Sequence, residues 1–173
     1  PSLFVTCCGG GGLVSGLAQG IRKHNWHRRT KLLVTETEGN NSFHLSVQVG
    51  GEPARLERIT SIATCLSAKE VCPQVRAHFK AASPQILSRL VSDRDAVTSC
   101  VRFANEHRFL VGLACGTALS GLYTGIVERI LCNTQTEGET AYDKVVDSDS
   151  DWTNNTDGPV VVIVCGGSEV TLD

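Results

Sequence analysis

Four consecutive glycines, Gly9 to Gly12, follow a short apolar run and precede a stretch with helical spacing. Because glycine has no side chain, several peptide N–H groups of such a loop can converge on one anion. The first turn of the helix that follows adds its own unpaired N–H groups and the positive end of its dipole. The pattern predicts a phosphate-binding loop made of Gly9, Gly10, Gly11 and Gly12.

Two known phosphate-binding motifs do not fit this loop. A Walker loop continues with Lys and then Ser or Thr after its last glycine, whereas Leu13 and Val14 stand here. The Rossmann spacing needs a glycine where Val14 or Ser15 stands, although Glu36, after the next expected strand, could still contact a ribose. A flexible turn without a ligand is the alternative to a phosphate site.

A second candidate site is the run Cys165-Gly166-Gly167-Ser168, which follows the apolar stretch Val160 to Val164. In open α/β sheets, ligands bind at the carboxyl ends of the strands, so a polar atom there can contact a ring held above the sheet. Taken alone, the simpler interpretation of this run is a tight turn after a buried strand.

A third candidate is the turn Glu36-Thr37-Glu38-Gly39-Asn40-Asn41-Ser42. A carboxylate, hydroxyl groups and turn carbonyls together are hard oxygen ligands, which suit a cation. A solvated turn without a ligand is the alternative, and these residues alone favour it.

The composition is that of one ordinary globular domain. The chain has 173 residues, 41% hydrophobic residues and a formal net charge of −2. Such a balance gives no bulk electrostatic attraction to nucleic acid or to a membrane surface. No apolar run approaches the roughly 20 residues of a spanning helix, and the first residues show no signal-peptide pattern, so neither feature is expected in this stretch.

The eight cysteines favour a reduced, cytoplasmic protein over a disulfide framework. Six of them stand mostly in apolar runs, where a free cysteine behaves as a small buried hydrophobic residue: Cys7, Cys8, Cys100, Cys115, Cys132 and Cys165. The sequence has no C-x2-C pair, so a zinc site is not expected. The chain contains no methionine and opens on Pro1, directly before a strand of the buried type. We therefore expect it to be a piece of a longer protein.

The hydrophobic pattern predicts an α/β fold with a mostly parallel sheet between helices, a three-layer α/β/α sandwich. The expected strands are Leu3 to Cys8, Lys31 to Thr35, Leu87 to Val91 and Val160 to Val164, with a weak strand near Lys69 to Cys72. The expected helices are Leu13 to Lys23 (with Leu13, Leu17 and Ile21 on one face), Phe43 to Val49, Pro73 to Ala82, Ala96 to Glu106 and Cys115 to Leu131. The polar, acidic stretch 133–159 is expected to be a surface insert.

Six motifs in one order together resemble the pyridoxal-phosphate-dependent serine/threonine dehydratases. They are Gly9-Gly10-Gly11-Gly12-Leu13, Glu36-Thr37-x-Gly39-x-x-Ser42-Phe43-His44, Thr60-Ser61-Ile62-Ala63, Val91-Ser92-Asp93-x-x-Ala96-Val97, Ala114-Cys115-Gly116-x-Ala118-Leu119 and Val164-Cys165-Gly166-Gly167-Ser168. The resemblance covers the chain except 133–159, and it is strongest to the animal-type serine dehydratases. It implies the C-terminal portion of a fold type II enzyme, similar to the tryptophan synthase β chain.

The resemblance also implies a site. The cofactor phosphate would lie on Gly9, Gly10, Gly11 and Gly12, followed by Leu13, and the pyridine nitrogen would meet the thiol of Cys165, next to Gly166. A potassium ion would be bound by the side chains of Glu36 and Ser42 and by the main-chain carbonyls of Gly9, Asn40, Leu66 and Ala68.

The activity implied is the β-elimination of L-serine to pyruvate and ammonia, or of L-threonine to 2-oxobutanoate. A thiol is a much weaker acid than a carboxyl group, so it cannot keep the pyridine nitrogen protonated as a carboxylate would. The ring is then a weaker electron sink, which suits β-elimination. The family further implies a cytoplasmic homodimer in amino-acid metabolism and gluconeogenesis, with a small-molecule substrate and no nucleic-acid or membrane partner.

The chain departs from the family in its catalytic part. The family's Schiff-base lysine lies in a Ser-aromatic-Lys motif ahead of the glycine loop, and neither it nor the Ser-Gly-Asn loop that binds the substrate carboxylate is present. Ser67-Ala68-Lys69 imitates the lysine motif only superficially, and Gly112-Leu113 replaces the usual Glu-Pro. The other lysines are Lys23, Lys31, Lys80 and Lys144.

We therefore expect residues 1–173 to be the C-terminal part of the large cofactor-binding domain. The N-terminal part, with the lysine and the small domain, would be absent, and the chain alone would be inactive. Two other hypotheses remain open at this point. One is a non-catalytic pyridoxal-phosphate-binding pseudoenzyme or regulatory module, and the other is a nucleotide-binding oxidoreductase domain.

Overall fold

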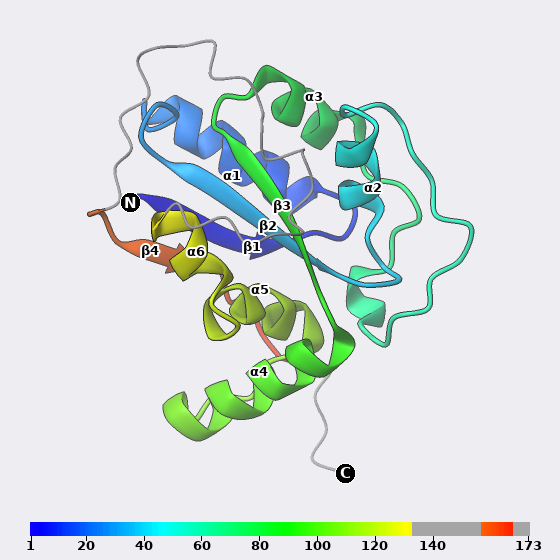
Figure 1. Ribbon diagram of the computed structural model, residues 1–173, viewed down its shortest axis with the longest axis vertical. Helices are drawn as coiled ribbons and strands as arrows, with labels where there is room; N and C mark the ends of the chain where they lie inside the picture. The colour runs from blue at the N-terminus through cyan, green and yellow to red at the C-terminus, as the bar shows by residue number, and fades with distance from the viewer. Residues whose placement is uncertain (133–156, 168–173) are drawn as a thin grey trace.

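A computed structural model describes residues 1–132 and 157–167 of the chain (Figure 1). Its centre is a four-stranded sheet of order β3-β2-β1-β4 in which every pair is parallel. The strands are β1 (Leu3–Cys7), β2 (Lys31–Thr37), β3 (Ile86–Val91) and β4 (Val160–Val162). Val5 of β1 lies opposite Leu33 of β2 on one side and Val162 of β4 on the other.

Helices cover both faces of this sheet (Figure 1). One face carries α1 (Gly12–Lys23), α2 (Ser42–Gln48) and α3 (Pro73–Ala81). The other face carries α5 (Leu113–Tyr123) and α6 (Ile126–Cys132), with α4 (Asp93–His107) packed on α5 farther from the sheet. A 3₁₀ turn, Thr64–Leu66, stands in the long connection between α2 and α3. The three-layer α/β/α fold expected from the sequence is confirmed.

Two hydrophobic cores follow from the alternation of side chains along the strands. Leu32 and Val34 of β2 point to the α1–α3 side, where Val14, Val75 and Phe43 are fully buried. The neighbouring residues of the strands point to the other side and pack against α6 and β4. That second core contains Leu3, Val5, Leu33, Val91, Ile126 and Val127.

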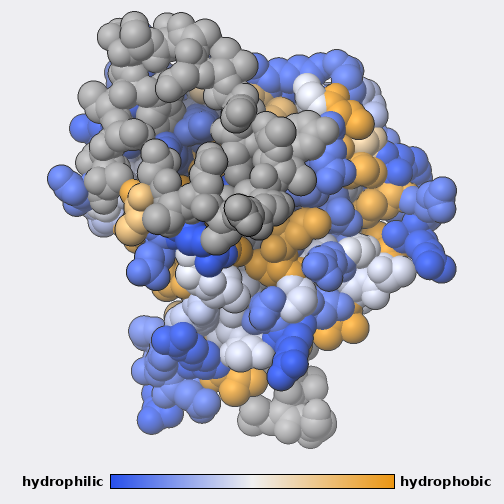
Figure 2. Space-filling model, viewed as in Figure 1, coloured by the Kyte–Doolittle hydropathy of each residue, from blue (hydrophilic) through white to orange (hydrophobic). Residues whose placement is uncertain are grey.

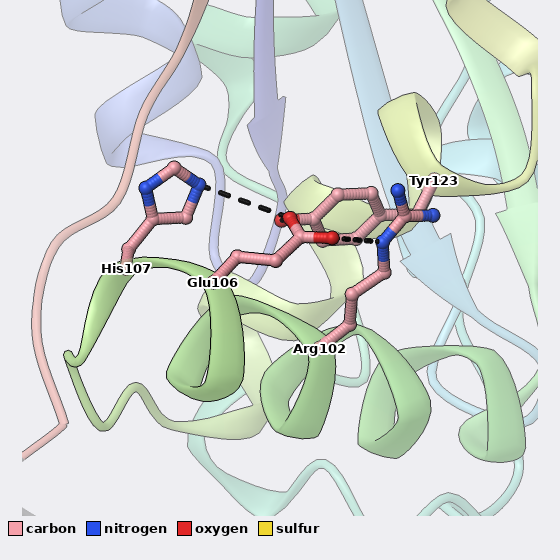
Figure 3. Close-up of polar contacts among 4 residues, drawn as sticks. All are labelled: Arg102, Glu106, His107 and Tyr123. Atoms are coloured by element: carbon pink, nitrogen blue, oxygen red, sulfur yellow. Dashed lines mark hydrogen bonds and ion pairs between the residues drawn. The ribbon is translucent and has the colours of Figure 1, made fainter.

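Small residues let α4 and α5 approach closely. A Cβ on Gly116 of α5 would lie 2.3 Å from the Ala96 carbonyl oxygen, and the Ser99 and Ser120 hydroxyls are 3.0 Å apart. At the exposed edge of the pair, Glu106 accepts hydrogen bonds from Arg102 (2.7 Å) and Tyr123 (3.1 Å), and the Arg102 guanidinium lies over the Tyr123 ring (Figure 3). The helix α4 begins with a capping box formed by Ser92 and Asp95.

Several expectations about the elements need correction. The helix predicted over 115–131 is two helices, because Gly125 at φ +78° interrupts it. Residues 69–72 form no strand, and the Cys72 N–H donates to the Gly10 carbonyl instead (2.9 Å). The buried face of α1 contains Val14 and Ala18, whereas Leu13 is 44% exposed.

The last strand is also different from the expectation. The strand β4 ends at Val162, and its residues are half-buried, because β4 stands at the edge of the sheet in the part of the chain that the structure describes. An apolar run shows that a strand is packed, but it does not show which strands will flank it. Most of the expected surface insert, residues 133–156, and Ser168 lie outside the described residues.

The surface is mixed in character. On the face shown in Figure 2, hydrophobic side chains form separate patches among hydrophilic ones. Within residues 1–132 and 157–167, every helix is too short or too polar to cross a bilayer. All eight cysteines are free thiols; Cys8 and Cys115 are buried, whereas Cys132 and Cys165 are exposed, so these two are not the core residues that the sequence predicts.

Candidate cofactor-binding site

The three candidate sites lie at the same edge of the sheet, because the strands are parallel and each site follows the carboxyl end of a strand. The glycine loop follows β1, the Glu36 turn closes β2, and Cys165 follows β4. The chain leaves β1 through α1 on one face and later reaches β4 from helices on the opposite face (Figure 1). The gap between the ends of β1 and β4 is therefore a topological switch point, where open α/β sheets bind ligands.

The glycine loop is closed toward the protein and open toward this gap. A Cβ on Gly11, which has φ +92° and caps α1, would lie 2.7 Å from the Val75 side chain. At Gly10 and Gly12 the same test finds no atom within 4 Å. The first turn of α1 carries no acidic side chain. An anion placed outside the loop would meet peptide N–H groups and the positive end of α1.

Cys165 stands on the other side of the gap. The Ile163 N–H donates to the Val5 carbonyl (2.9 Å), which carries the β1–β4 pairing one residue beyond β4. Cys165 is exposed, and its neighbour Gly166 has φ +148°. Burial, and then the nearby Cys115 and Cys165 thiols, raise the pKa of Cys7 to about 12, so the Cys7 thiol at the end of β1 stays protonated.

Glu36 is a fully buried carboxyl group at the end of β2. It accepts hydrogen bonds from the peptide N–H groups of Phe43 (2.9 Å) and His44 (2.6 Å), in the first turn of α2. Burial raises the pKa of Glu36 from 4.5 to about 8, and the two peptide N–H groups oppose this shift only in part. Burial, and then the charge of Glu36, raise the pKa of the Cys8 thiol well above its usual value.

The other residues expected at a cation are Ser42 and Asn40 in the turn after Glu36, together with Gly9, Leu66 and Ala68. Ser42 and Asn40 are 2% and 1% exposed, and the Asn40 amide donates to the Ala63 carbonyl (3.0 Å) while its oxygen Oδ1 is buried without a partner. Gly9 faces Leu66, whose carbonyl oxygen lies 3.2 Å from the position of a Cβ on Gly9. Ala68 follows two residues later and is half-buried. The unpartnered oxygen and the buried carboxyl group fit a cation.

Comparisons with known proteins identify the family of the chain. Residues 1–140 match the family of pyridoxal-phosphate dependent enzymes. The chain belongs to the pyridoxal-phosphate dependent enzymes. The nucleotide-binding oxidoreductase considered from the sequence is thereby set aside.

Relatives of this pyridoxal-phosphate-family chain include serine dehydratases. It is 35% identical over 171 residues to "Serine dehydratase-like" from Mus musculus and 35% identical over 172 residues to "L-serine dehydratase/L-threonine deaminase" from Rattus norvegicus. It covers 46% and 42% of these proteins, so the chain spans slightly less than half the length of the curated relatives it matches, whereas each match takes in 99% of this chain.

Solved structures give the same result for the fold. An L-serine ammonia-lyase from the fungus Rhizomucor miehei matches with a TM-score of 0.77 and 29% identity, over 99% of this chain and 47% of that one. A serine racemase from maize matches with a TM-score of 0.70 at 17% identity, over 99% of this chain and 45% of that one. The fold type II architecture expected for this pyridoxal-phosphate-family chain is thereby confirmed.

The residues present fit pyridoxal phosphate at the gap between β1 and β4. The open positions of Gly10 and Gly12 leave room for a phosphate, and the exposed Cys165 thiol is available to a pyridine nitrogen. Leu13, the first residue after the loop, is 44% exposed and could contact a bound group.

The four lysines among the described residues stand away from the glycine loop. The Lys69 ammonium group donates to the Glu57 carbonyl at the surface (2.9 Å), and Lys80 pairs with Glu52. Lys31 is the first residue of β2, so it lies at the amino end of the strands, whereas the glycine loop lies at their carboxyl end. Lys23 is the last residue of α1, at the far end of this helix from the glycine loop. Lys144 lies outside the described residues.

The side chains of Thr37, Ser61 and Asp93 form a hydrogen-bonded cluster to which the sequence analysis assigns no role. The buried Ser61 hydroxyl donates to the Asp93 carboxylate (2.6 Å) and lies 2.8 Å from the Thr37 hydroxyl, and Asp93 also accepts from the Ile62 N–H (3.1 Å). These hydrogen bonds fix the loop before the 3₁₀ turn to the last residue of β2, Thr37, and to the first residue of α4, Asp93. Both Ser61 and Asp93 stand in the family motifs, and this was the only signal in the sequence.

Proposed function

We propose that the protein to which this chain belongs is a pyridoxal-phosphate-dependent lyase. It converts L-serine to pyruvate and ammonia, and L-threonine to 2-oxobutanoate and ammonia. The observation that carries this proposal is the convergence of the glycine loop, Cys165 and Glu36 around the end of β1. The printed names of the serine dehydratases that this chain resembles support the substrate class.

When bound, pyridoxal phosphate supplies an electron-withdrawing ring that stabilises the charge left at the substrate α-carbon when its proton is removed. The peptide N–H groups of Gly9 to Gly12 and the positive end of α1 would hold the phosphate and so orient the ring. Cys165 would place a thiol at the pyridine nitrogen, and a thiol, unlike a carboxylate partner, would not keep that nitrogen protonated. The chemistry is thereby directed to elimination of the β-hydroxyl group.

We also place a potassium ion beside the glycine loop, held by Glu36, Ser42 and the carbonyls of Gly9, Asn40, Leu66 and Ala68. Burial makes the Glu36 carboxyl group costly to ionise and raises its pKa to about 8. A bound cation neutralises the carboxylate. The turn that follows β2 would then be held in one position against the phosphate loop.

Residues 1–173 are, in this proposal, the C-terminal part of the large cofactor-binding domain. They hold the phosphate, the ring nitrogen and the cation, while the lysine that carries the cofactor comes from another part of the protein. Lys69 does not take this role, because its ammonium group is engaged with the Glu57 carbonyl at the surface. The 173-residue chain alone would therefore be inactive.

The test compares the full-length protein with the 173-residue chain. Each is incubated with pyridoxal phosphate, potassium and L-serine, and the pyruvate formed is measured by the NADH that lactate dehydrogenase consumes in reducing it to lactate. We expect pyruvate from the full-length protein and none from the 173-residue chain. Turnover by the 173-residue chain would refute the division of the site, and its absence from the full-length protein would refute the lyase.

A non-catalytic pyridoxal-phosphate-binding module is the second candidate. The substitution of Gly112-Leu113 for the usual Glu-Pro favours it, since a carboxyl group near the cofactor is lost. Gly112 caps α5 and donates its N–H to the Gly166 carbonyl (3.1 Å), so the change falls directly beside Cys165. A full-length protein that binds pyridoxal phosphate without a Ser-aromatic-Lys motif, and without turnover, would establish this alternative.

We further propose a cytoplasmic homodimer. The eight free thiols support a reducing compartment. Light scattering of the full-length protein measures its mass directly, and a monomeric mass would contradict the dimer.

A further inference from the structure

The Cys115 thiol touches the main chain on both sides of the Cys165–Gly166 peptide bond. It accepts a hydrogen bond from the Cys165 N–H (3.2 Å) and donates its own hydrogen to the Gly166 carbonyl (3.3 Å). Cys115 and Cys165 are separated by 50 positions in the sequence. One side chain of α5 therefore fixes the peptide group directly before Cys165 and the peptide group directly after Gly166.

The start of α5 closes around the same segment. The Gly112 N–H also donates to the Gly166 carbonyl (3.1 Å). A Cβ on Gly167 would lie 2.3 Å from the Leu110 carbonyl oxygen, so the chain after Cys165 lies against the residues that lead into α5. The segment from Cys165 to Gly167 is held by α5, whereas on the β4 side its regular pairing ends at Ile163.

Cys115 is itself firmly held. It is 3% exposed and packs in a core with Val111 and Leu119, against which Cys100 and Phe103 of α4 also pack. The close contact of Gly116 with the Ala96 carbonyl fixes α5 on α4. The position of the Cys115 sulfur is thus determined by the packing of two helices.

We propose that Cys115 is a positioning residue, which sets where the Cys165 thiol stands relative to the cofactor ring. The inference rests on the proposed role of Cys165 at the pyridine nitrogen. Without the Cys115 thiol, the Cys165 peptide group loses its hydrogen-bond partner, and the Gly166 carbonyl keeps only the Gly112 N–H. Cys165 then moves more freely around its place at the ring.

The first test measures hydrogen exchange of the Cys165 amide in the full-length protein without pyridoxal phosphate. We compare Cys115→Ala and Cys115→Val, which cannot form hydrogen bonds, with Cys115→Ser, which can. The matched control is Cys100→Ala, which removes a thiol that packs against the same core but donates to the Gly112 carbonyl (3.5 Å) instead of to the Cys165–Gly167 segment. We expect exchange about fivefold faster or more in the Ala and Val variants.

In Cys115→Ser and Cys100→Ala we expect a rate within about twofold of the unmodified protein. An unchanged rate in the Ala or Val variant, or an equal acceleration in Cys100→Ala, would overturn the proposal. The Val variant covers the case in which the cavity left by Ala unfolds the protein. Because no cofactor is present, this result does not depend on the proposed function.

The second test asks whether Cys115 acts through Cys165. The dissociation constant of pyridoxal phosphate is measured for Cys115→Ala, Cys165→Ala and the double variant. We expect Cys115→Ala to weaken binding about threefold or more in the presence of Cys165 and to have no further effect in its absence. Equal effects in both backgrounds would show a merely structural role, and a protein that does not bind pyridoxal phosphate would refute the proposed function instead.

Discussion

Gly10, Gly11 and Gly12 are adjacent in the sequence, yet the structure gives them different tasks. Gly11 has a left-handed backbone conformation and lies against Val75, so glycine is needed there to form the loop. Gly10 and Gly12 face open space, so no contact within the protein requires glycine at either position. If the loop binds a phosphate, the requirement at Gly10 and Gly12 comes from the ligand.

A pair of alanine substitutions separates these two tasks. We expect Gly11→Ala to lower the free energy of unfolding by about 1–3 kcal/mol, through backbone strain and the contact with Val75. Gly12→Ala should leave stability within about 0.5 kcal/mol and weaken pyridoxal phosphate binding about tenfold. Chemical denaturation and a binding titration give the two quantities, and unchanged cofactor affinity in Gly12→Ala would argue against a phosphate at this loop.

Glu36 gives a prediction for the pH dependence of stability. The folded-state pKa of about 8 lies above the usual 4.5, so the unfolded chain loses this proton first. The stability associated with protonated Glu36 is full below pH 4.5, falls as the pH rises toward 8, and then stays constant. Potassium that neutralises the carboxylate opposes this loss. The Cys8 thiol, which faces Glu36, stays protonated across the same range.

We therefore expect potassium to raise the melting temperature more at pH 8 than at pH 5, with tetramethylammonium at the same ionic strength as the reference. The isosteric variant Glu36→Gln should show no such difference. Differential scanning fluorimetry measures both. An equal effect of the two cations at pH 8 in the unmodified protein would remove the cation site.

At the scale of elements, the α4–α5 pair combines a close contact inside with polar contacts outside. Gly116 touches the Ala96 carbonyl in the interior, whereas Arg102, Glu106, His107 and Tyr123 meet at the exposed edge (Figure 3). Exposed ion pairs contribute little to stability, since water solvates the same charges in the unfolded chain. The close contact should therefore dominate.

Gly116→Ala tests this difference against Tyr123→Phe. The new Cβ would lie 2.3 Å from the Ala96 carbonyl oxygen and 2.5 Å from the Cys100 sulfur, so the helices must separate. We expect Gly116→Ala to cost about 3 kcal/mol of unfolding free energy, even though alanine favours helices. Tyr123→Phe should change the melting temperature by no more than about 1 °C. The reverse order would show that the exposed cluster holds the helices together.

Much of this arrangement could be predicted from the sequence, because it depends on local patterns. Hydrophobic periodicity gives the four strands and most helices, and the motifs around Gly9, Glu36 and Cys165 identify the family. Local patterns do not show which residues far apart in the sequence lie next to each other in the fold. The edge position of β4 and the contact between Cys115 and Cys165 bring together residues far apart in the chain. The break at Gly125 was missed because the small residues of that stretch suit a continuous helix.

For the molecule as a whole, the strand order explains why these separate motifs form one site. Because β1 lies between β2 and β4, the glycine loop at its end has the Glu36 turn on one side and Cys165 on the other. The helices change face at this same strand, which leaves the gap for a ligand. The proposed positions of the phosphate, the cation and the ring thus all depend on one topological feature.

The most direct test of this account is a crystal structure of the full-length protein with pyridoxal phosphate. We predict the phosphate against the peptide N–H groups of Gly9 to Gly12, and the pyridine nitrogen within hydrogen-bonding distance of the Cys165 sulfur. A phosphate bound away from the glycine loop, or a ring whose nitrogen points away from Cys165, would contradict it.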